Sequence, residues 1–161
     1  MFLTGRKGIM MKVKEIMSHP VITVTEDTTL EEVARVMLEK GIGCVPVVDE
    51  QNKIVGIITH GDFIAKEKGL PFSFFRAPQL FGQWLKEGAE TIYEAAKLMT
   101  AKDIMTRNPT TMTEDDLVKT VLEKMLSNKI THVPIVKEDV PIGIVARQDL
   151  LKMMTNFVKP E

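Results

Sequence analysis

The sequence predicts an α+β protein in which a β-α-β-β-α unit occurs twice, and an internal repeat is the main evidence for it. Three segments recur 88 residues later in the chain. Ile16-Met17 corresponds to Ile104-Met105, Thr25-Glu26-Asp27 corresponds to Thr113-Glu114-Asp115, and Val45-Pro46-Val47-Val48 corresponds to Val133-Pro134-Ile135-Val136. From Gly56 and Gly143 onward the offset is 87, so one residue was lost between the last two strands, where a loop tolerates the loss. A unit of roughly 50 residues buries too little surface to be stable alone. We therefore expect the two copies to share one core.

The first elements of copy one follow from apolar periodicity and capping residues. Residues 21–24 are rich in β-branched side chains, which favours a strand. Thr28 and Thr29 are candidate N-caps with acidic residues three positions later. They begin a helix that ends at Gly41 and carries apolar residues at a spacing that predicts one buried stripe. The members of the stripe are Leu30, Val33, Ala34, Met37 and Leu38.

Two strands and a second helix complete each copy. Residues 44–48 and 54–59 are apolar runs on either side of a polar turn, and Gly61 begins a helix that continues through Lys66. Copy two repeats the pattern, with a strand at 110–112, a helix at 116–128, strands at 132–136 and 142–146, and a helix at 148–157. Its inward helix positions are Val118, Val121, Leu122, Met125 and Leu126.

A segment of different composition separates the copies. It is rich in aromatic residues, namely Phe72, Phe74, Phe75, Phe81, Trp84 and Tyr93, and residues 82–97 have a helical pattern. Such a segment must be buried against its own chain, a second subunit or another partner. The predicted organisation is a leader at 1–11, repeat one at 12–66, an aromatic insert with a helix at 67–100 and repeat two at 101–157.

Composition excludes several classes of protein. The net charge of -1 removes any bulk electrostatic argument for binding nucleic acid. No apolar run approaches the ~20 residues that a membrane span needs, and residues 1–11 lack the apolar stretch of a secretory signal. Cys44 is the only cysteine, which excludes an internal disulfide and fits a reducing compartment. We expect a soluble, cytoplasmic protein with no nucleic-acid or membrane partner.

Three motifs in each copy carry a resemblance to a known family. Each copy has an opening hydrophobic-Met-Ser/Thr, a central hydrophobic-Pro-hydrophobic-Val and a closing Gly-containing strand followed by Asp. In copy one they are Ile16-Met17-Ser18, Val45-Pro46-Val47-Val48 and Gly56-Ile57-Ile58-Thr59-His60-Gly61-Asp62, and in copy two Ile104-Met105-Thr106, Val133-Pro134-Ile135-Val136 and Gly143-Ile144-Val145-Ala146-Arg147-Gln148-Asp149. The motifs resemble the cystathionine-β-synthase (CBS) domain, and the pair resembles a Bateman module. The resemblance implies repeats packed about a pseudo-twofold axis, dimerisation, and binding of AMP, ADP, ATP or S-adenosylmethionine.

The resemblance also implies roles for residues in two ligand clefts. Asp62 and Asp149 would accept hydrogen bonds from ribose hydroxyls. Ala146 replaces Thr59 in copy two, so Arg147 would supply the phosphate contact there. The candidate phosphate-binding residues are Thr59, His60, Arg147, Thr131 and His132. The candidate adenine-lining residues are Thr23, Val24, Val45 and Pro46 in one copy, and Thr111, Met112, Val133 and Pro134 in the other.

The residues alone leave other roles open. Acidic residues in the first turn of a helix stabilise its dipole, which accounts for Asp62 and Asp149 without a ligand. His132 also fits a surface histidine, and the adenine-lining positions also fit an ordinary core. His19, His60 and His132 lack metal-ligand spacing and no nucleophile with a base is evident, so we expect neither a metal site nor catalysis.

Two functions are compatible with this pattern. The first is a regulatory sensor in which an adenosine-containing ligand changes the state of a homodimer or of an unknown protein partner. The alternative is a nucleotide-independent interaction module, or a regulatory subunit, that docks through the aromatic insert. Thr59 with Asp62 favours the sensor, whereas Ala146 favours the alternative.

Overall fold

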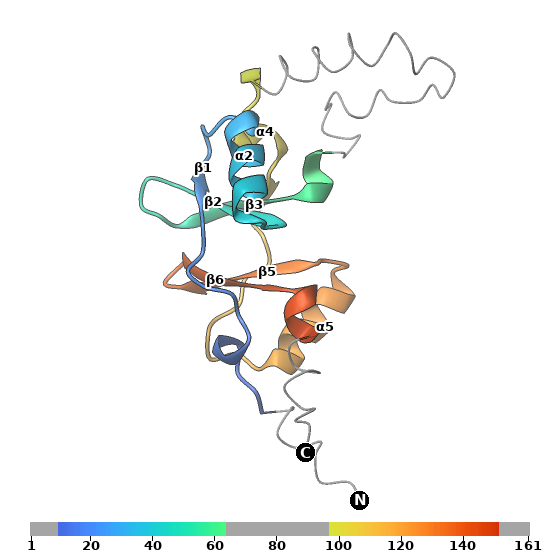
Figure 1. The fold of residues 1–161 in the computed structure, drawn as a ribbon. Coiled ribbons are helices and arrows are strands. Elements are labelled where there is room, and N and C mark those ends of the chain that lie inside the picture. The colour runs from blue at the N-terminus through green and yellow to red at the C-terminus, as the bar shows by residue number, and fades with distance from the viewer. Residues whose placement is uncertain (1–9, 64–96, 152–161) are drawn as a thin grey trace, which may run out of the picture. The chain divides into compact units, whose positions relative to one another are not determined.

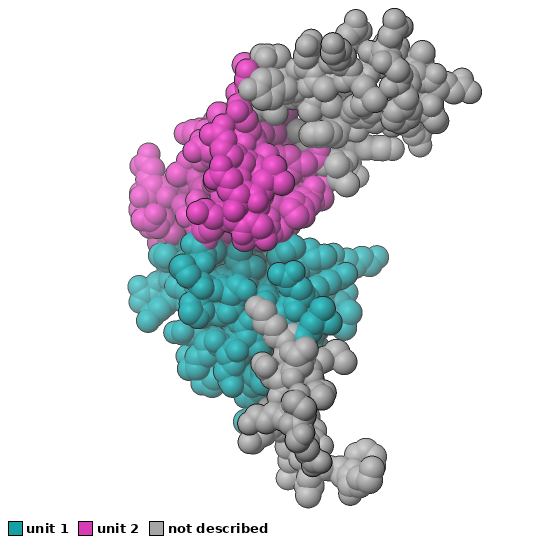
Figure 2. All heavy atoms as spheres, viewed as in Figure 1, with its two compact units in different colours: residues 1–21, 109–161 teal, residues 22–108 magenta. Residues whose placement is uncertain are grey.

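The described residues of the computed structural model, 10–63 and 97–151, belong to two compact units (Figures 1 and 2). Residues 22–108 form one, which we call the Asp62 unit. Residues 1–21 and 109–161 form the other, which we call the Asp149 unit. Residues 1–9 of the expected leader, 64–96 with most of the expected insert, and 152–157 of the expected last helix lie outside the described residues.

The Asp62 unit is built on a four-stranded sheet with the strand order β1-β2-β3-β4. The β1 strand is parallel to β2, and the other two pairings are antiparallel. Its strands are β1 (Val24–Thr25), β2 (Cys44–Val48), β3 (Ile54–Thr59) and β4 (Thr106–Arg107), and its helices are α2 (Leu30–Lys40), η2 (His60–Phe63) and α4 (Ala101–Ile104). The predicted bounds of β2 and β3 are confirmed.

Helix α2 has the predicted caps but a narrower buried stripe. The Thr29 hydroxyl accepts a hydrogen bond from the backbone N–H of Glu32 at 3.3 Å, and Gly41 ends the helix in the left-handed conformation with φ 60°. The prediction that Leu38 is buried is wrong, because 81% of it is exposed. Leu38 is rotated by about 100° around the helix from the buried Met37, which takes it off the face that meets the sheet.

The Asp149 unit repeats this architecture. An antiparallel pair, β5 and β6, is flanked by a parallel bridge from Met112 to Ile135 and an antiparallel bridge from Ser18 to Ile144. The predicted strand at 110–112 is therefore only a bridge. Leu126 was predicted to be buried, but 76% of it is exposed. Like Leu38, it is rotated by about 100° around its helix from a buried methionine, here Met125. The elements are η1 (Val13–Glu15), α5 (Val118–Ser127), β5 (His132–Lys137) and β6 (Val140–Ala146), and residues 147–151 are helical.

Each unit takes its opening segment from the other repeat. Val13 and Ile16 open repeat one in the sequence but lie in the core of the Asp149 unit. Ala101 and Ile104 open repeat two but lie in the core of the Asp62 unit. Among residues 10–63 and 97–151 the buried side chains form two clusters, and each cluster contains residues of both repeats. Buried apolar side chains on these opening segments supply the driving force, because both clusters would otherwise be open on that side.

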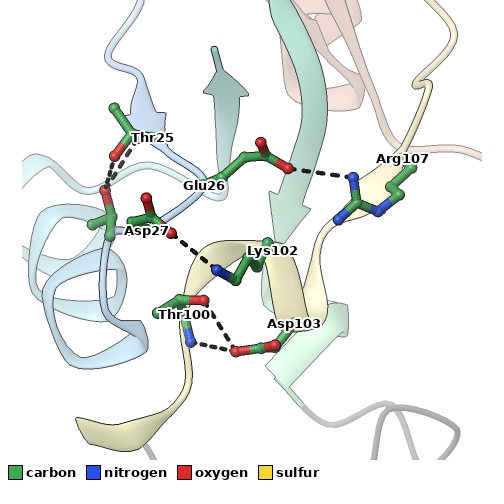
Figure 3. A network of polar contacts seen from close by, with 8 residues as sticks. Thr25, Glu26, Asp27, Thr100, Lys102, Asp103 and Arg107 are labelled. Carbon is green, nitrogen blue, oxygen red and sulfur yellow. Dashed lines mark hydrogen bonds and ion pairs between the residues drawn. The ribbon is translucent and has the colours of Figure 1, made fainter. Parts of the chain in front are cut away.

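Exposed ion pairs also link each of these opening segments, which we call the exchanged segments, to the unit in which it lies. In the Asp62 unit Lys102 Nζ lies 3.0 Å from Asp27 Oδ1, and Arg107 lies 3.3 Å from Glu26 (Figure 3). In the Asp149 unit Lys14, which corresponds to Lys102, lies 3.1 Å from Asp115. Exposed pairs of this kind contribute little to stability, because solvent screens the two charges. The buried apolar residues of each segment therefore provide most of the stability.

Candidate ligand site

Asp62 lies in η2, directly after β3, and its carboxylate is held by the closing motif. Its Oδ2 atom accepts hydrogen bonds from the backbone N–H of Thr59 at 2.7 Å and from the Thr59 hydroxyl at 2.9 Å. The residue is only 8% exposed. The Thr59 hydroxyl, which we expected to face phosphate, thus donates to Asp62 in the structure.

Asp149 occupies the corresponding place after β6. It is 1% exposed, and its Oδ2 atom accepts a hydrogen bond from the backbone N–H of Ala146 at 2.7 Å. Ala146 has no hydroxyl, so it cannot add the second bond that Thr59 donates to Asp62. The two carboxylates therefore share a position and a backbone donor but differ in side-chain partners.

Hydroxyls of the opening motifs also reach these carboxylates. Thr106 Oγ1 lies 3.4 Å from Asp62 Oδ1, and Ser18 Oγ lies 3.3 Å from Asp149 Oδ1. The sequence pattern did not indicate a role for Ser18 or Thr106. The available signal was that both occupy the third position of the opening motif, 88 residues apart.

Local hydrogen bonding alone does not distinguish these aspartates from helix-capping ones. Asp103 accepts the backbone N–H and the hydroxyl of Thr100 at 2.7 and 3.0 Å (Figure 3), and Asp116 is bonded in the same way to Thr113. Asp103 is exposed and Asp116 is half-buried. Within residues 10–63 and 97–151, only Asp62 and Asp149 are buried charged side chains. Burial therefore distinguishes Asp62 and Asp149 from the aspartates that only cap a helix.

The candidate phosphate-binding residues come together at the closing end of each sheet. In the Asp149 unit His132 pairs with Ala146, and the backbone N–H of Arg147 donates to the Thr131 carbonyl at 3.1 Å. The Thr131 hydroxyl lies 2.8 Å from His132 Nδ1. In the Asp62 unit Cys44 pairs with Thr59, and the backbone N–H of His60 donates to the Gly43 carbonyl at 3.4 Å. His60, Thr131 and Arg147 are exposed, so their side chains are accessible to a ligand.

The candidate adenine-lining residues mostly lie in the hydrophobic cores. Val45 and Val133 have no exposed area, and Val24 and Met112 are also buried in the two clusters. Pro46 and Pro134 are buried as well. Thr23 is exposed and Thr111 is half-buried. These apolar side chains pack in the cores, and their role in lining an adenine stays a prediction.

A cavity of about 330 Å³ lies elsewhere in the Asp62 unit, at the other ends of β1 and β2. It is lined by four carboxylate residues together with Thr25, Val48 and Gln51, and the four are Glu26, Asp27, Asp49 and Glu50. Neither Thr59 nor Asp62 lines it. Because these carboxylates repel phosphate, we do not assign a nucleotide to this cavity.

Two other kinds of site are not found in the part of the chain that the structure describes. None of its His, Cys, Asp and Glu side chains form a group of three or more that could hold a metal ion. None of its helices has the length and apolar character to cross a membrane.

A comparison with models of protein families identifies the family to which this chain belongs. The model of the CBS domain matches residues 13–69 and 101–156, which are the two repeats. The chain belongs to the CBS domain family. The opening and closing motifs described above are thus parts of two CBS domains.

Solved structures of CBS pairs have the same fold. The CBS domain of a membrane protein from Sphaerobacter thermophilus is 37% identical with a TM-score of 0.76, over 91% of this chain and 90% of that chain. The CBS domain pair of protein MJ0100, solved in complex with 5′-methylthioadenosine and S-adenosyl-L-methionine, is 29% identical with a TM-score of 0.68, over 92% and 99% of the two chains.

Several curated relatives are much longer than this chain. An uncharacterised Rickettsia prowazekii protein is 31% identical over 88% of this chain, which corresponds to 37% of the relative. Inosine-5′-monophosphate dehydrogenase from Methanocaldococcus jannaschii is 33% identical over 88% of this chain and 23% of its own length. The shared part of these relatives is therefore the CBS pair and not the whole protein.

Cys44 is expected to be chemically inert in the folded protein. Burial, with a smaller contribution from the charge of Asp62, raises the pKa of its thiol from 9.0 to about 12. At pH 8 the thiolate, which is the reactive form, is then roughly 1000-fold rarer than in an exposed cysteine. Below pH 9 the thiol keeps its proton in both the folded and the unfolded protein, so its contribution to the free energy of unfolding is fully present. As the pH rises from 9 toward 12, only the unfolded thiol loses its proton, which favours the unfolded state, and this contribution is lost.

Alkylation with iodoacetamide, followed by mass spectrometry, measures this difference. We expect negligible labelling of the native protein at pH 8 and complete labelling of the same sample in guanidinium chloride. Rapid labelling of the native protein would show that Cys44 is accessible and would contradict the assigned burial.

Proposed function

We propose that this CBS pair is a regulatory sensor without catalytic activity that binds an adenosine-containing ligand. The candidate ligands are AMP, ADP, ATP and S-adenosylmethionine. Asp62 and Asp149 accept the ribose hydroxyls, while His60, Thr131, His132 and Arg147 face the phosphates or the equivalent 5′ substituent, and the Thr59 hydroxyl donates to Asp62. Ligand binding shifts the population of conformations according to its different affinity for each of them.

The burial of Asp62 and Asp149 carries this proposal. Each carboxylate is fixed by a backbone N–H of the closing motif, at 2.7 Å, and is nearly removed from solvent. A diol supplies two hydroxyl donors, which a buried and oriented carboxylate can accept in addition to the hydrogen bonds from the protein. The exposed Asp103, with the same local hydrogen bonds, illustrates the capping function by itself.

Similarity to the MJ0100 CBS pair supports an adenosine ligand. That protein, about 30% identical, was solved with 5′-methylthioadenosine and S-adenosyl-L-methionine. Both ligands contain adenosine, which is the moiety that the ribose-binding carboxylates are proposed to recognise.

The proposed output is a change in a homodimer or in a protein partner in the cytoplasm. Leu38 and Leu126 occupy corresponding positions on α2 and α5, and both are strongly exposed. Exposed large apolar side chains at repeated positions favour association with another protein surface. A nucleotide-independent interaction module is the second candidate, because Ala146 lacks the hydroxyl of Thr59.

A calorimetric titration against AMP, ADP, ATP, S-adenosylmethionine and 5′-methylthioadenosine tests the sensor. We expect binding by at least one compound, with unequal sites. The Asp62 site should be the stronger, because the Thr59 hydroxyl orients its carboxylate, whereas Ala146 has no hydroxyl to donate to Asp149, whose site should be weaker or more tolerant of uncharged ligands. Arg147→Ala should reduce the remaining phosphate preference at the Asp149 site. Two identical sites for AMP would contradict the asymmetry, and no binding at millimolar concentration would favour the interaction module.

A further inference from the structure

The third residue of each opening motif lies beside the carboxylate of the other repeat. Thr106 is opposite Ile57 in the pairing of β4 with β3, and its hydroxyl donates to Asp62 Oδ1 at 3.4 Å. Ser18 is opposite Ile144 in an antiparallel bridge, and its hydroxyl donates to Asp149 Oδ1 at 3.3 Å. The same arrangement is thus formed twice, by residues on different segments of the chain. Such repetition argues against a chance contact.

The backbone around these hydroxyls is held firmly. The Ser18 N–H donates to the Ile144 carbonyl at 2.9 Å, and the Ile144 N–H donates back at 3.1 Å. The preceding methionine packs against the glycine of the closing motif, because a Cβ added at Gly143 would lie 2.7 Å from the Met17 sulfur. Met105 packs against Gly56 in the same way. Each hydroxyl is therefore carried by a segment whose position is set by two independent contacts.

We propose that Thr106 and Ser18 are positioning residues for the ribose-binding carboxylates, an inference that rests on the proposed function. A carboxylate accepts about four hydrogen bonds, so protein donors and a diol can share it. The closing motif holds Oδ2, and the hydroxyl of the opening motif holds Oδ1, which together fix the rotation of the carboxylate about its last bond. Each site then depends on a hydroxyl that the sequence places in the other repeat.

Ribose discrimination tests the assignment, with adenosine and 2′,3′-dideoxyadenosine as probes. All proteins carry Asp149→Asn, so that the Asp62 site is the one titrated. Thr106→Val keeps the shape of the side chain but removes the hydroxyl. We expect this substitution to weaken the affinity for adenosine by about five- to tenfold and to leave the affinity for 2′,3′-dideoxyadenosine unchanged. Thr106→Ser, which keeps the hydroxyl, should restore the preference. The reciprocal set, Ser18→Ala and Ser18→Thr in an Asp62→Asn background, tests the other site.

A double-mutant cycle separates positioning from a structural effect. If Thr106 acts through Asp62, then Thr106→Val has no further effect on adenosine binding once Asp62 is replaced by Asn. Equal weakening of both probes by Thr106→Val, or effects that add to those of Asp62→Asn, would overturn the assignment while leaving the sensor intact. Failure of the parent protein itself to bind adenosine would overturn the sensor and the positioning role together.

Discussion

Replacing Asp62 with asparagine is expected to weaken binding of an adenosine ligand by about 10- to 100-fold. A hydrogen bond to a charged group contributes about 1.5–3 kcal/mol, which corresponds to one to two orders of magnitude in affinity. The asparagine oxygen can still accept the Thr59 N–H, whose distance to Asp62 is 2.7 Å. We therefore expect a much smaller loss of thermal stability than of affinity. Calorimetry and thermal melts of the same preparations measure the two effects.

Asp103→Asn is the matched control for this substitution. Asp103 lies in the same unit and makes the same two hydrogen bonds to a threonine three residues earlier, but its side chain is exposed. It should leave adenosine affinity unchanged. Equal affinities of Asp62→Asn and the unmodified protein would mean that the buried carboxylate does not contact ribose.

Replacing Ile104 with alanine is expected to destabilise the unit that contains repeat one, although Ile104 belongs to repeat two in the sequence. Ile104 is completely buried in the core of the Asp62 unit, together with Val45 and Ile58. Removing a buried isoleucine in this way costs about 2–5 kcal/mol. Hydrogen exchange should show the largest loss of protection in β2 and β3, and adenosine binding at the Asp62 site should weaken with it.

The reciprocal substitution, Ile16→Ala, should have the opposite pattern. Ile16 lies in the core of the Asp149 unit, so β5 and β6 should lose protection first. Leu98→Ala is the neutral control, since Leu98 is 85% exposed although it lies only six residues before Ile104. If Ile104→Ala instead opened β5 and β6 first, the segment exchange described here would be incorrect.

Part of the site could be predicted from the sequence and part could not. Asp62 and Asp149 were identified because the closing motif that ends at each aspartate is a local pattern, repeated in both copies, that resembles the CBS domain. Thr106 and Ser18 were missed because their neighbours in space lie 44 and 131 residues away along the chain. The burial that distinguishes Asp62 from Asp103 was likewise not visible in the local pattern, since the spacing from threonine to aspartate is the same in both.

The sequence by itself determined the repeat, the family and the strands at Cys44–Val48 and Ile54–Thr59, because periodicity and capping act over a few neighbouring residues. Only the tertiary structure decided which opening segment joins which core. Both segments carry similar apolar residues and corresponding lysines, so local preference does not choose between them. The arrangement is visible only in contacts between residues far apart in the sequence: Ile16 is buried in the core of the Asp149 unit and Ile104 in the core of the Asp62 unit.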